Sequence, residues 1–348
     1  MSAANRIKIL VVDDSAIVRK VLTEALSAES DLEVVGTAPD PYVARDKILS
    51  LSPDVITLDI EMPRMDGLTF LKKLMQHHPM PVVVISSLGQ ASCAAAMEAL
   101  REGAVEVLAK PGGPYSVGEL RITLANKIRA AARARVSREA PAEPAETTAA
   151  PAPATLVQQA ADARRVVAIG ASTGGTEAIE KVLRALPANV PGLVITQHIP
   201  AGFSKAFADR LNQVCALEVM EAKDGDAVRP GRALIAPGNF HMLLRRASSG
   251  YRVSVKDGPM VCYQRPSVDV LFTSVAEAAG AHAVGVLLTG MGSDGAQGLL
   301  KMRQAGAATA AQNEATCVVF GMPREAIKLG AAGEVLPLPR VPGWIAAS

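Results

Sequence analysis

The chain has 348 residues, of which 49% are hydrophobic and 20% are charged. A chain of this length and composition can bury real cores, in one large domain or two ordinary ones, which excludes a wholly disordered protein. The 36 basic and 34 acidic side chains give a formal net charge of +2, and only 3% of the residues are aromatic. These values give no support to nucleic-acid binding, to base-stacking surfaces or to an aromatic carbohydrate groove.

Three further features bear on the compartment. The four cysteines lie far apart and form no CxxC pair, which argues against a disulfide scaffold or structural zinc and fits a reducing compartment. The N-terminal sequence MSAANRIKILVVDDS has a short apolar run that two acidic residues end, unlike a signal peptide. No apolar run approaches the length of about 18 residues that a membrane span needs. We therefore expect a cytoplasmic protein without membrane insertion.

One segment divides the chain. Residues 130–163 are rich in Ala and Pro and show almost no apolar periodicity, although the first residues, AAARARV, continue a helical pattern. Such a segment cannot bury enough surface to offset its ordering entropy, so we interpret it as an interdomain linker. The sequence therefore predicts one domain over residues 1–129 and another over residues 164–348. A surface loop within one domain is the alternative, but structureless loops of this length are uncommon.

Strands and helices alternate in the N-terminal domain. The first run, Ile7–Val12 (IKILVV), is apolar apart from Lys8, as in a strand that is buried on both faces. The alternation predicts an α/β fold with a five-stranded, doubly wound parallel sheet, whose sites lie at the carboxyl ends of the strands. Further strands are expected at Leu32–Ala38, Val55–Leu58, Val82–Ile85 and Val105–Leu108. Helices are expected at Ala16–Leu26, Leu68–Met75, Ala94–Glu102 and Leu120–Arg129.

Polar side chains follow these strand ends. They are Asp13, Asp14, Asp59, Ser86 and Lys110. Three converging carboxylates would repel one another without a divalent cation between them, and hard oxygen ligands suit Mg²⁺. Lys110 and Ser86 would hold a tetrahedral oxyanion, so the set fits phosphoryl transfer onto a carboxylate. Any one of these residues alone is better explained as a solvated loop residue, and it is their joint placement that favours a site.

The segments VVDDS, LDIEMPRMDG and AKPGG carry a family likeness. Over about residues 5–127 the chain resembles the receiver domain of response regulators. The resemblance implies that Asp59 is the phosphoacceptor, that Ser86 and Lys110 form the switch pair, and that the Lys110–Pro111 peptide bond is cis. It also implies that Mg²⁺ is held by Asp13, Asp14, Asp59 and the backbone carbonyl of Glu61.

The C-terminal domain alternates in the same way. Val166–Gly170 (VVAIG) is an expected strand that runs into a Gly-rich turn and then a helix at Thr176–Leu186. The pattern predicts a second α/β domain with a mostly parallel sheet. Further strands are expected at Leu193–Gln197, Leu217–Met220, Ala233–Ile235, His241–Leu244, Tyr251–Val255 and Ala283–Thr289. Further helices are expected at Phe203–Gln213, Val268–Ala279 and Gly295–Ala305.

Three strand ends in this domain carry a nucleophile, a base and an acid. Ser172 lies in a strand-to-helix turn, His198 follows the next strand, and Asp294 lies in the turn after a later strand. In a Ser–His–Asp set the imidazole takes the serine proton and the carboxylate fixes its tautomer, and the chain order of the three varies between folds. Taken singly, Ser172 and Asp294 suit helix caps, and His198 suits the edge of a core. Together they favour a catalytic triad.

Two other interpretations remain open on the residues alone. Ser293 is a rival nucleophile beside Asp294, although Met291 stands where a GxSxG turn has Gly. The GASTGG turn also approximates the GxGxxG pattern of dinucleotide binding. However, Ser172 replaces the middle Gly, and His198 stands where an acidic residue would bind the ribose.

Five segments of this half carry a second likeness: AIGASTGGTEAI, ITQHIPAGF, APGNFHM, RPSVDVLF and LLTGMGSDGAQG. Over about residues 164–346 they are similar to the catalytic domain of the CheB family of chemotaxis protein-glutamate methylesterases. The resemblance implies that Ser172, His198 and Asp294 form the triad, that the Met291 N–H is an oxyanion donor, and that this domain needs no cofactor. It implies hydrolysis of glutamate γ-methyl esters and deamidation of glutamines, activated by phosphorylation of the receiver.

The resemblance also implies the biological setting. Methyl-accepting chemoreceptors would be the substrates, a chemotaxis histidine kinase the phosphodonor, and sensory adaptation in chemotaxis the role, at receptor arrays in the cytoplasm. Without phosphate, the receiver is expected to lie over the catalytic site. Two other classes stay open: a switched binding protein that only sequesters a partner, and a receiver fused to a nucleotide-dependent oxidoreductase.

Overall fold

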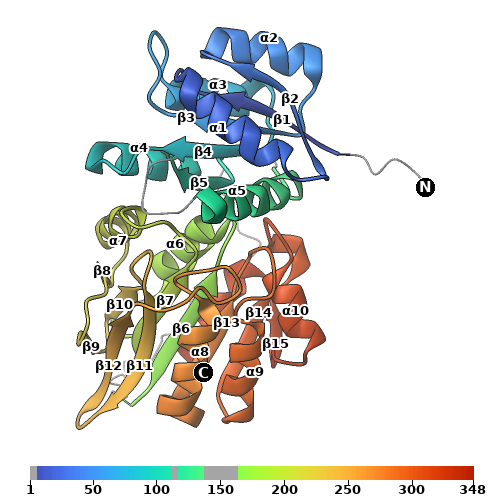
Figure 1. Ribbon diagram of the computed structural model, residues 1–348. Coiled ribbons are helices and arrows are strands. Elements are labelled where there is room, and N and C mark those ends of the chain that lie inside the picture. The colour runs from blue at the N-terminus through green and yellow to red at the C-terminus, as the bar shows by residue number, and fades with distance from the viewer. Residues whose placement is uncertain (1–5, 111–116, 137–163) are drawn as a thin grey trace, which may run out of the picture.

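The computed structural model describes residues 6–110, 117–136 and 164–348, which form two α/β domains, one above the other in Figure 1. The N-terminal domain contains a sheet in the order β2-β1-β3-β4-β5. Every neighbouring pair in it is parallel, so the carboxyl ends of the strands gather at one edge. The predicted five-stranded parallel fold is confirmed. The strands are β1 (Ile7–Val12), β2 (Leu32–Ala38), β3 (Val55–Asp59), β4 (Val82–Ser86) and β5 (Glu106–Ala109).

Helices cover both faces of this sheet (Figure 1). They are α1 (Ala16–Ser27), α2 (Pro41–Leu51), α3 (Gly67–His77), α4 (Gln90–Arg101) and α5 (Val117–Ala132). Helix α2 was not predicted from the sequence. Its start signal is clear in the structure, because the Asp40 side chain accepts hydrogen bonds from the N–H groups of Tyr42 and Val43, and proline opens the first turn.

The C-terminal domain is built on a seven-stranded sheet in the order β15-β14-β13-β6-β7-β10-β8. All its neighbouring pairs are parallel, which confirms the second α/β domain. A separate antiparallel sheet has the order β11-β12-β9. The predicted strands are observed as β6 (Val166–Ala171), β7 (Gly192–Gln197), β8 (Glu218–Glu221), β10 (Arg232–Ile235), β11 (His241–Ala247), β12 (Gly250–Lys256) and β13 (Ala283–Leu287). The predicted helices are observed as α6 (Gly175–Ala185), α7 (Phe203–Val214), α8 (Val268–Ala279) and α9 (Ala296–Gln304).

Five elements near the end or edge of this domain were not predicted. They are β9 (Ala227–Val228), β14 (Ala308–Gln312), α10 (Met322–Lys328), β15 (Glu334–Leu336) and α11 (Val341–Ala347). The sequence of β14, ATAAQ, lacks the β-branched and aromatic residues typical of strands, apart from one threonine. It is nevertheless a strand because it lies between β13 and β15 in the sheet. Pairing with its neighbours therefore overrides its weak propensity.

The boundary between the domains differs in detail from the expectation. Helix α5 continues to Ala132, three residues beyond the predicted domain end at residue 129. Most of the predicted linker, residues 137–163, lies outside the described residues, as does Pro111, whose cis peptide bond was expected. Among the helices that the structure describes, none has the length and apolar character to cross a membrane.

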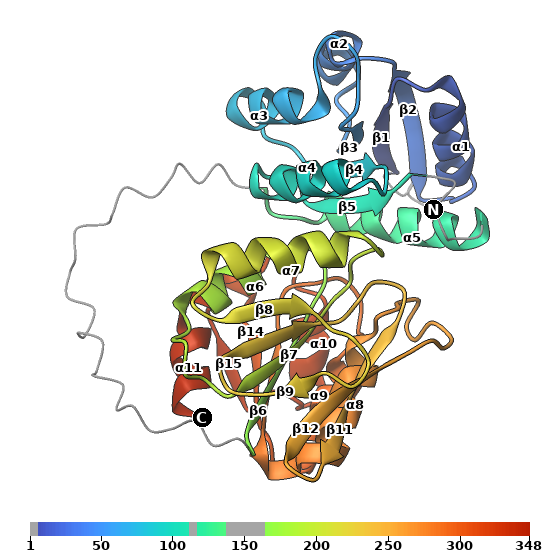
Figure 2. The same cartoon turned by 90° about the vertical axis from the view of Figure 1, so that its left-hand side faces the viewer.

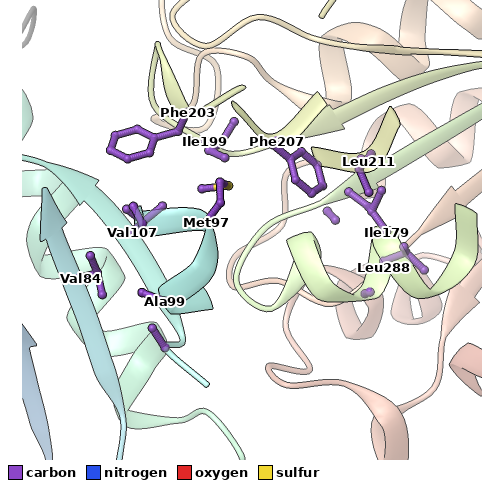
Figure 3. Packing of buried hydrophobic residues seen from close by; sticks show 14 of the residues in the cluster. Val84, Met97, Ala99, Val107, Ile179, Ile199, Phe203, Phe207, Leu211 and Leu288 are labelled. Atoms are coloured by element: carbon purple, nitrogen blue, oxygen red, sulfur yellow. The ribbon is translucent and has the colours of Figure 1, made fainter. Parts of the chain in front are cut away.

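The two domains share an apolar core at their junction. Helix α4 packs against α6 and α7, and α5 runs along the same junction (Figure 2). Figure 3 shows the packing, in which Met97 of α4 lies close to Phe203 and Ile199 of the catalytic half. These residues belong to one continuous buried cluster that extends through both domains. The α4–β5–α5 face of the N-terminal domain is therefore held against the C-terminal domain.

Candidate active site

Ser172 lies in the tight turn between β6 and α6. Its backbone N–H donates to Thr289 O at 3.0 Å, and its carbonyl accepts the side-chain amide of Gln197 at 2.8 Å. A Cβ on Gly290 would lie 2.6 Å from the Ser172 Cβ, so only glycine allows this close approach. The serine is 5% exposed. The surrounding backbone therefore fixes the position of Ser172 while leaving its hydroxyl at a cavity.

His198 and Asp294 form a buried pair beside this turn. The His198 Nε2 lies 2.7 Å from the Asp294 Oδ2, and both side chains are at most 3% exposed. The carboxylate accepts, so Nε2 carries the proton and Nδ1 is the free, basic nitrogen. The Nδ1 atom is buried and has no hydrogen-bond partner in the described part of the chain. A neutral imidazole in this tautomer is ready to accept a proton.

The surroundings of Asp294 keep its carboxylate ionised. Burial by itself raises the pKa of Asp294, but the hydrogen bond from His198, with donors at Asp269 and Ser267, brings that pKa below its ordinary value. The N–H of Val268, the first residue of α8, donates to Oδ2 at 2.7 Å. The carboxylate thus sits at a helix N-terminus, where negative charge is stabilised.

A cavity of about 300 Å³ joins these groups. It is lined by Ser172, His198, Asp294, Met291 and Ser293 of the catalytic half, by the turn of residues 262–264, and by Thr123, Asn126, Lys127 and Ala130 of α5. The structure therefore brings the three predicted triad residues into one cavity. No hydrogen bond joins the Ser172 hydroxyl to His198 among the described residues; catalytic bonds of this kind often form only with substrate bound.

Two other predicted positions line the same cavity. The backbone N–H of Met291 donates no hydrogen bond within the described ranges, so it is available to a bound oxyanion. Ser293, the rival nucleophile, is exposed, and its carbonyl accepts the N–H of Ala296 in the turn that opens α9. Asp294, the partner of the His198 imidazole, lies three residues after Met291 on the chain. Ser172 and Ser293 thus both line the cavity, but only Ser172 is buried.

The predicted receiver residues gather at the carboxyl edge of the N-terminal sheet. Oxygens of Asp13, Asp14 and Asp59 lie within 4.8 Å of one another. Lys110 Nζ lies 2.7 Å from the Asp59 Oδ2 and 3.5 Å from the Asp13 Oδ2. Burial, together with the charge of Asp13, raises the pKa of Asp59 to about 6, although Lys110 opposes the rise. The Asp13 Oδ2 is buried without a hydrogen-bond partner. Clustered hard oxygens of this kind fit Mg²⁺.

Ser86 and Glu61 lie beside this cluster. Ser86 ends β4, is fully buried, and donates its hydroxyl to the Ser92 carbonyl of α4 at 3.4 Å. The Glu61 N–H donates to Asp59 Oδ1 at 3.1 Å, and the Glu61 carboxylate accepts hydrogen bonds from Ser87 and Ser92. Both residues therefore connect the carboxylate cluster around Asp59 to the start of α4, the helix that packs on the C-terminal domain.

A buried polar contact between the domains was not predicted. The Thr173 hydroxyl donates to Glu106 Oε2 at 2.8 Å, and Lys127 Nζ lies 2.7 Å from the same carboxylate oxygen. Lys127 also lies 3.5 Å from the His198 carbonyl. Glu106 did leave a signal in the sequence, because it is a single acidic residue inside the apolar strand AVEVLA, and a buried charge needs a partner. The partners come from distant parts of the chain and could not be read from it.

Comparison with known proteins agrees with both halves. Residues 9–119 match the family described as response regulator receiver domain, and residues 167–345 match the family described as CheB methylesterase. The chain is 57% identical over 335 residues to a protein-glutamate methylesterase/protein-glutamine glutaminase 2 of Syntrophus aciditrophicus, covering 96% of each chain. It is 53% identical over 340 residues to a protein-glutamate methylesterase/protein-glutamine glutaminase of Salmonella choleraesuis, covering 97% of this chain and 95% of that one.

A solved structure supports the assignment of the catalytic half. The Thermotoga maritima CheB methylesterase catalytic domain matches with a TM-score of 0.52 and 38% identity, covering 53% of this chain and 97% of that one. The likenesses that the sequence segments suggested are thus confirmed. The chain belongs to the CheB methylesterase family and carries a response-regulator receiver domain before its catalytic domain.

Proposed function

We propose that this chain hydrolyses glutamate γ-methyl esters on methyl-accepting chemoreceptors and deamidates receptor glutamines. The observation that carries the proposal is the buried 2.7 Å pair of His198 and Asp294 in the cavity that Ser172 also lines. Membership of the CheB methylesterase family and the printed activities of its relatives support the same chemistry. The proposed setting is adaptation in chemotaxis, in the cytoplasm at receptor arrays.

The proposed reaction proceeds by an acyl-enzyme. His198 Nδ1 takes the proton of the Ser172 hydroxyl as its oxygen attacks the ester carbonyl carbon. The Met291 N–H stabilises the resulting oxyanion, and removal of one such donor typically costs about 10²–10³ in rate. The tetrahedral species collapses, and methoxide leaves as methanol with the proton from Nδ1. Water, deprotonated by the same nitrogen, then releases Ser172 and a glutamate carboxylate.

Deamidation follows the same route with a different leaving group. A glutamine amide passes through an equivalent tetrahedral species, from which nitrogen leaves as ammonia after protonation by His198. The product is again a glutamate carboxylate. One site built from Ser172, His198 and Asp294 therefore accounts for both activities.

The position of the receiver supports control by phosphorylation. Helix α5 forms one wall of the catalytic cavity. It runs along the side of the receiver that faces the catalytic domain (Figure 2). A cavity of about 300 Å³ accepts a side chain but not a receptor helix, which is about 10 Å across. In our proposal Asp59 takes a phosphoryl group from a chemotaxis histidine kinase. The added charge reorganises Lys110, Ser86 and the start of α4, which weakens docking and opens the cavity.

The receiver residues fit a magnesium ion. Asp13, Asp14, Asp59 and the Glu61 carbonyl would hold it, and the buried Asp13 Oδ2, which accepts no hydrogen bond from the described residues, would be one ligand. When bound, Mg²⁺ would neutralise charge on the transferring phosphoryl group. Lys110 holds Asp59 in position and would pair with the phosphoryl oxygens, and Ser86 would donate its hydroxyl to them.

The direct test is product release from methylated receptors. The wild-type chain should release methanol from receptor membranes that carry labelled methyl esters, and Ser172→Ala should lower this release by about 10⁴-fold or more. Circular dichroism of the variant should match wild type, because the bonds that hold Ser172 in its turn come from its backbone N–H and carbonyl, which alanine keeps. Retained methanol release in Ser172→Ala would contradict the assignment of the nucleophile.

A further inference from the structure

Two sequence segments of the catalytic half contain none of the proposed triad residues, yet they meet beside it. They are residues 236–242 (APGNFHM) and 265–272 (RPSVDVLF). The Arg265 guanidinium donates to the Asn239 side-chain oxygen at 2.7 and 3.1 Å. The Ser267 N–H donates to His241 Nδ1 at 3.2 Å. The two segments are therefore joined at two points, and the second point leads directly to Asp294.

The tautomer of His241 is set by its partners. Its Nε2 lies 2.9 Å from the Pro259 carbonyl, which can only accept, so Nε2 carries the proton. The Nδ1 is then the acceptor that the Ser267 N–H needs. His241 is 5% exposed and lies at the start of β11, a rigid strand of the antiparallel sheet. The neutral imidazole thus donates to the Pro259 carbonyl and accepts from the Ser267 N–H, and the second bond fixes the position of Ser267.

Ser267 in turn holds the Asp294 carboxylate in place. Its side chain is fully buried, and its hydroxyl donates to Asp294 Oδ1 at 2.8 Å. The next two backbone N–H groups, of Val268 and Asp269, donate to the same carboxylate at 2.7 and 2.9 Å. Three consecutive residues therefore bind both oxygens of Asp294. The His198 Nε2–H donates to the same carboxylate, at Oδ2.

Capping of α8 does not explain this arrangement by itself. The Ser267 hydroxyl accepts the Val270 N–H at 3.4 Å, a long bond for a helix cap, whereas its bond to Asp294 is 2.8 Å. The hydroxyl has one proton, and that proton is directed to the carboxylate. The shorter bond shows which contact the side chain is placed to make.

We propose that His241 and Ser267 are positioning residues of the esterase, and that they act through Asp294 to hold His198 in its Nε2–H tautomer. This leaves Nδ1 free to accept the Ser172 proton. The inference rests on the proposed function, and it names residues that touch neither substrate nor the reacting atoms. A carboxylate that is free to rotate would allow the other tautomer, in which the basic nitrogen faces the wrong group.

The test compares substitutions in the full-length chain by two readouts. One is kcat and KM for methanol release from labelled receptor membranes. The other is the His198 tautomer, read from ¹⁵N imidazole shifts; the chain has five histidines, so His198→Gln assigns the signal. We expect Ser267→Ala to lower kcat about 10-fold, to leave KM within two-fold, and to convert His198 to a mixture of tautomers.

Two isosteric variants of His241 separate positioning from folding. His241→Asn keeps an acceptor near the place of Nδ1, whereas His241→Gln keeps the donor to Pro259 and loses that acceptor. We expect the Asn variant to retain most of the wild-type kcat and the Gln variant to behave like Ser267→Ala. Ser274→Ala is the matched control, because Ser274 is a buried serine of the same helix that bonds Leu244 and Leu271, not Asp294.

The outcomes distinguish this inference from the proposed function. Wild-type kcat with an unchanged His198 tautomer in Ser267→Ala would overturn the inference, as would equal kcat values for His241→Asn and His241→Gln. Equal loss in Ser274→Ala would do the same, since it would show a general packing effect. If the wild-type chain releases no methanol, the proposed function fails, and the tautomer measurement still decides whether the two residues position His198.

Discussion

The Thr173 hydroxyl donates a 2.8 Å hydrogen bond to the Glu106 carboxylate, which joins the residue after the proposed nucleophile to the last strand of the receiver sheet. Glu106 begins β5, and Lys110, which pairs with Asp59, directly follows that strand. One short strand thus connects the phosphorylation site to the catalytic turn. The contact with Thr173 is made by the first residue of β5, and the contact with Asp59 by the residue that follows its last.

The first prediction concerns the buried pair of Glu106 and Lys127, whose side chains are 5% and 9% exposed. Lys127→Met leaves the Glu106 carboxylate buried without a counter-charge while the domains are docked, and removal of one partner of such a pair typically costs about 3–5 kcal/mol. Undocking would hydrate that carboxylate. We therefore expect higher methanol release without a phosphodonor and a smaller further increase with one.

The double variant Glu106→Gln/Lys127→Met is the control for this prediction. It removes both charges, so the docked state no longer carries an unpaired carboxylate, and we expect part of the low basal rate to return. Equal basal rates in the single and double variants would show that Lys127 acts in some other way. An unchanged basal rate in Lys127→Met would contradict a role for the pair in docking.

The second prediction uses Cys93 to report on docking. Cys93 is 3% exposed, and its Sγ lies 3.6 Å from where a Cβ on Gly202, in the catalytic half, would be. Separation of the domains would uncover the thiol, so a phosphodonor with Mg²⁺ should increase its rate of maleimide labelling. The background is low once Cys262→Ser is introduced, because burial raises the pKa of Cys215 to about 11 and of Cys317 to about 12.

The control for the labelling experiment is Asp59→Asn in the same Cys262→Ser background. This variant has no phosphoacceptor, and its Cys93 labelling rate should not change when phosphodonor is added. The same acceleration in both proteins would show that the effect does not come from phosphorylation. No acceleration in the parent, with Asp59 phosphorylated, would mean that the domains stay docked.

The third prediction concerns pH and the receiver carboxylates. The pKa of Asp59 is raised to about 6 by burial and by Asp13, so the folded state holds this proton more tightly than the unfolded chain. Stability should therefore fall as pH rises from about 4 to about 6 and then level off. Asp59→Asn removes the effect and should stabilise the receiver at pH 8, by on the order of 2 kcal/mol in chelator.

Thermal melts at pH 5 and pH 8 check this expectation. The gain in melting temperature of Asp59→Asn over wild type should be larger at pH 8 than at pH 5. Added Mg²⁺ should narrow the difference at pH 8, because a cation among the carboxylates relieves the same repulsion. A gain that does not depend on pH would contradict the raised pKa of Asp59.

Much of this arrangement could be predicted from the sequence, because both domains follow simple alternation. Continuous apolar runs such as Ile9–Val12 form buried parallel strands, and polar residues that follow them must meet at one sheet edge. This is why the cluster around Asp59 and the cavity shared by Ser172 and His198 could be anticipated. Both arrangements need only that the carboxyl ends of the strands share one edge of the sheet, and in a parallel sheet they always do.

Elements with weak local signals, and bonds between residues far apart in the chain, could not be predicted in the same way. Helix α2 has weak amphipathic character, and β14 is built from small residues, so both depend on their neighbours. The bonds of Ser267 to Asp294 and of Glu106 to Thr173 join residues 27 and 67 positions apart. No local pattern specifies such a pairing, although a lone charge in an apolar strand does indicate that a partner exists.

The most direct test of the account is methanol release from methylated receptor membranes, with and without a small-molecule phosphodonor and Mg²⁺, for wild type and Asp59→Asn. Phosphodonor should raise release by the wild-type chain and leave Asp59→Asn at its basal rate, because only Asp59 can carry the charge that undocks the receiver. Equal stimulation of both proteins, or no release by wild type with Asp59 demonstrably phosphorylated, would contradict it.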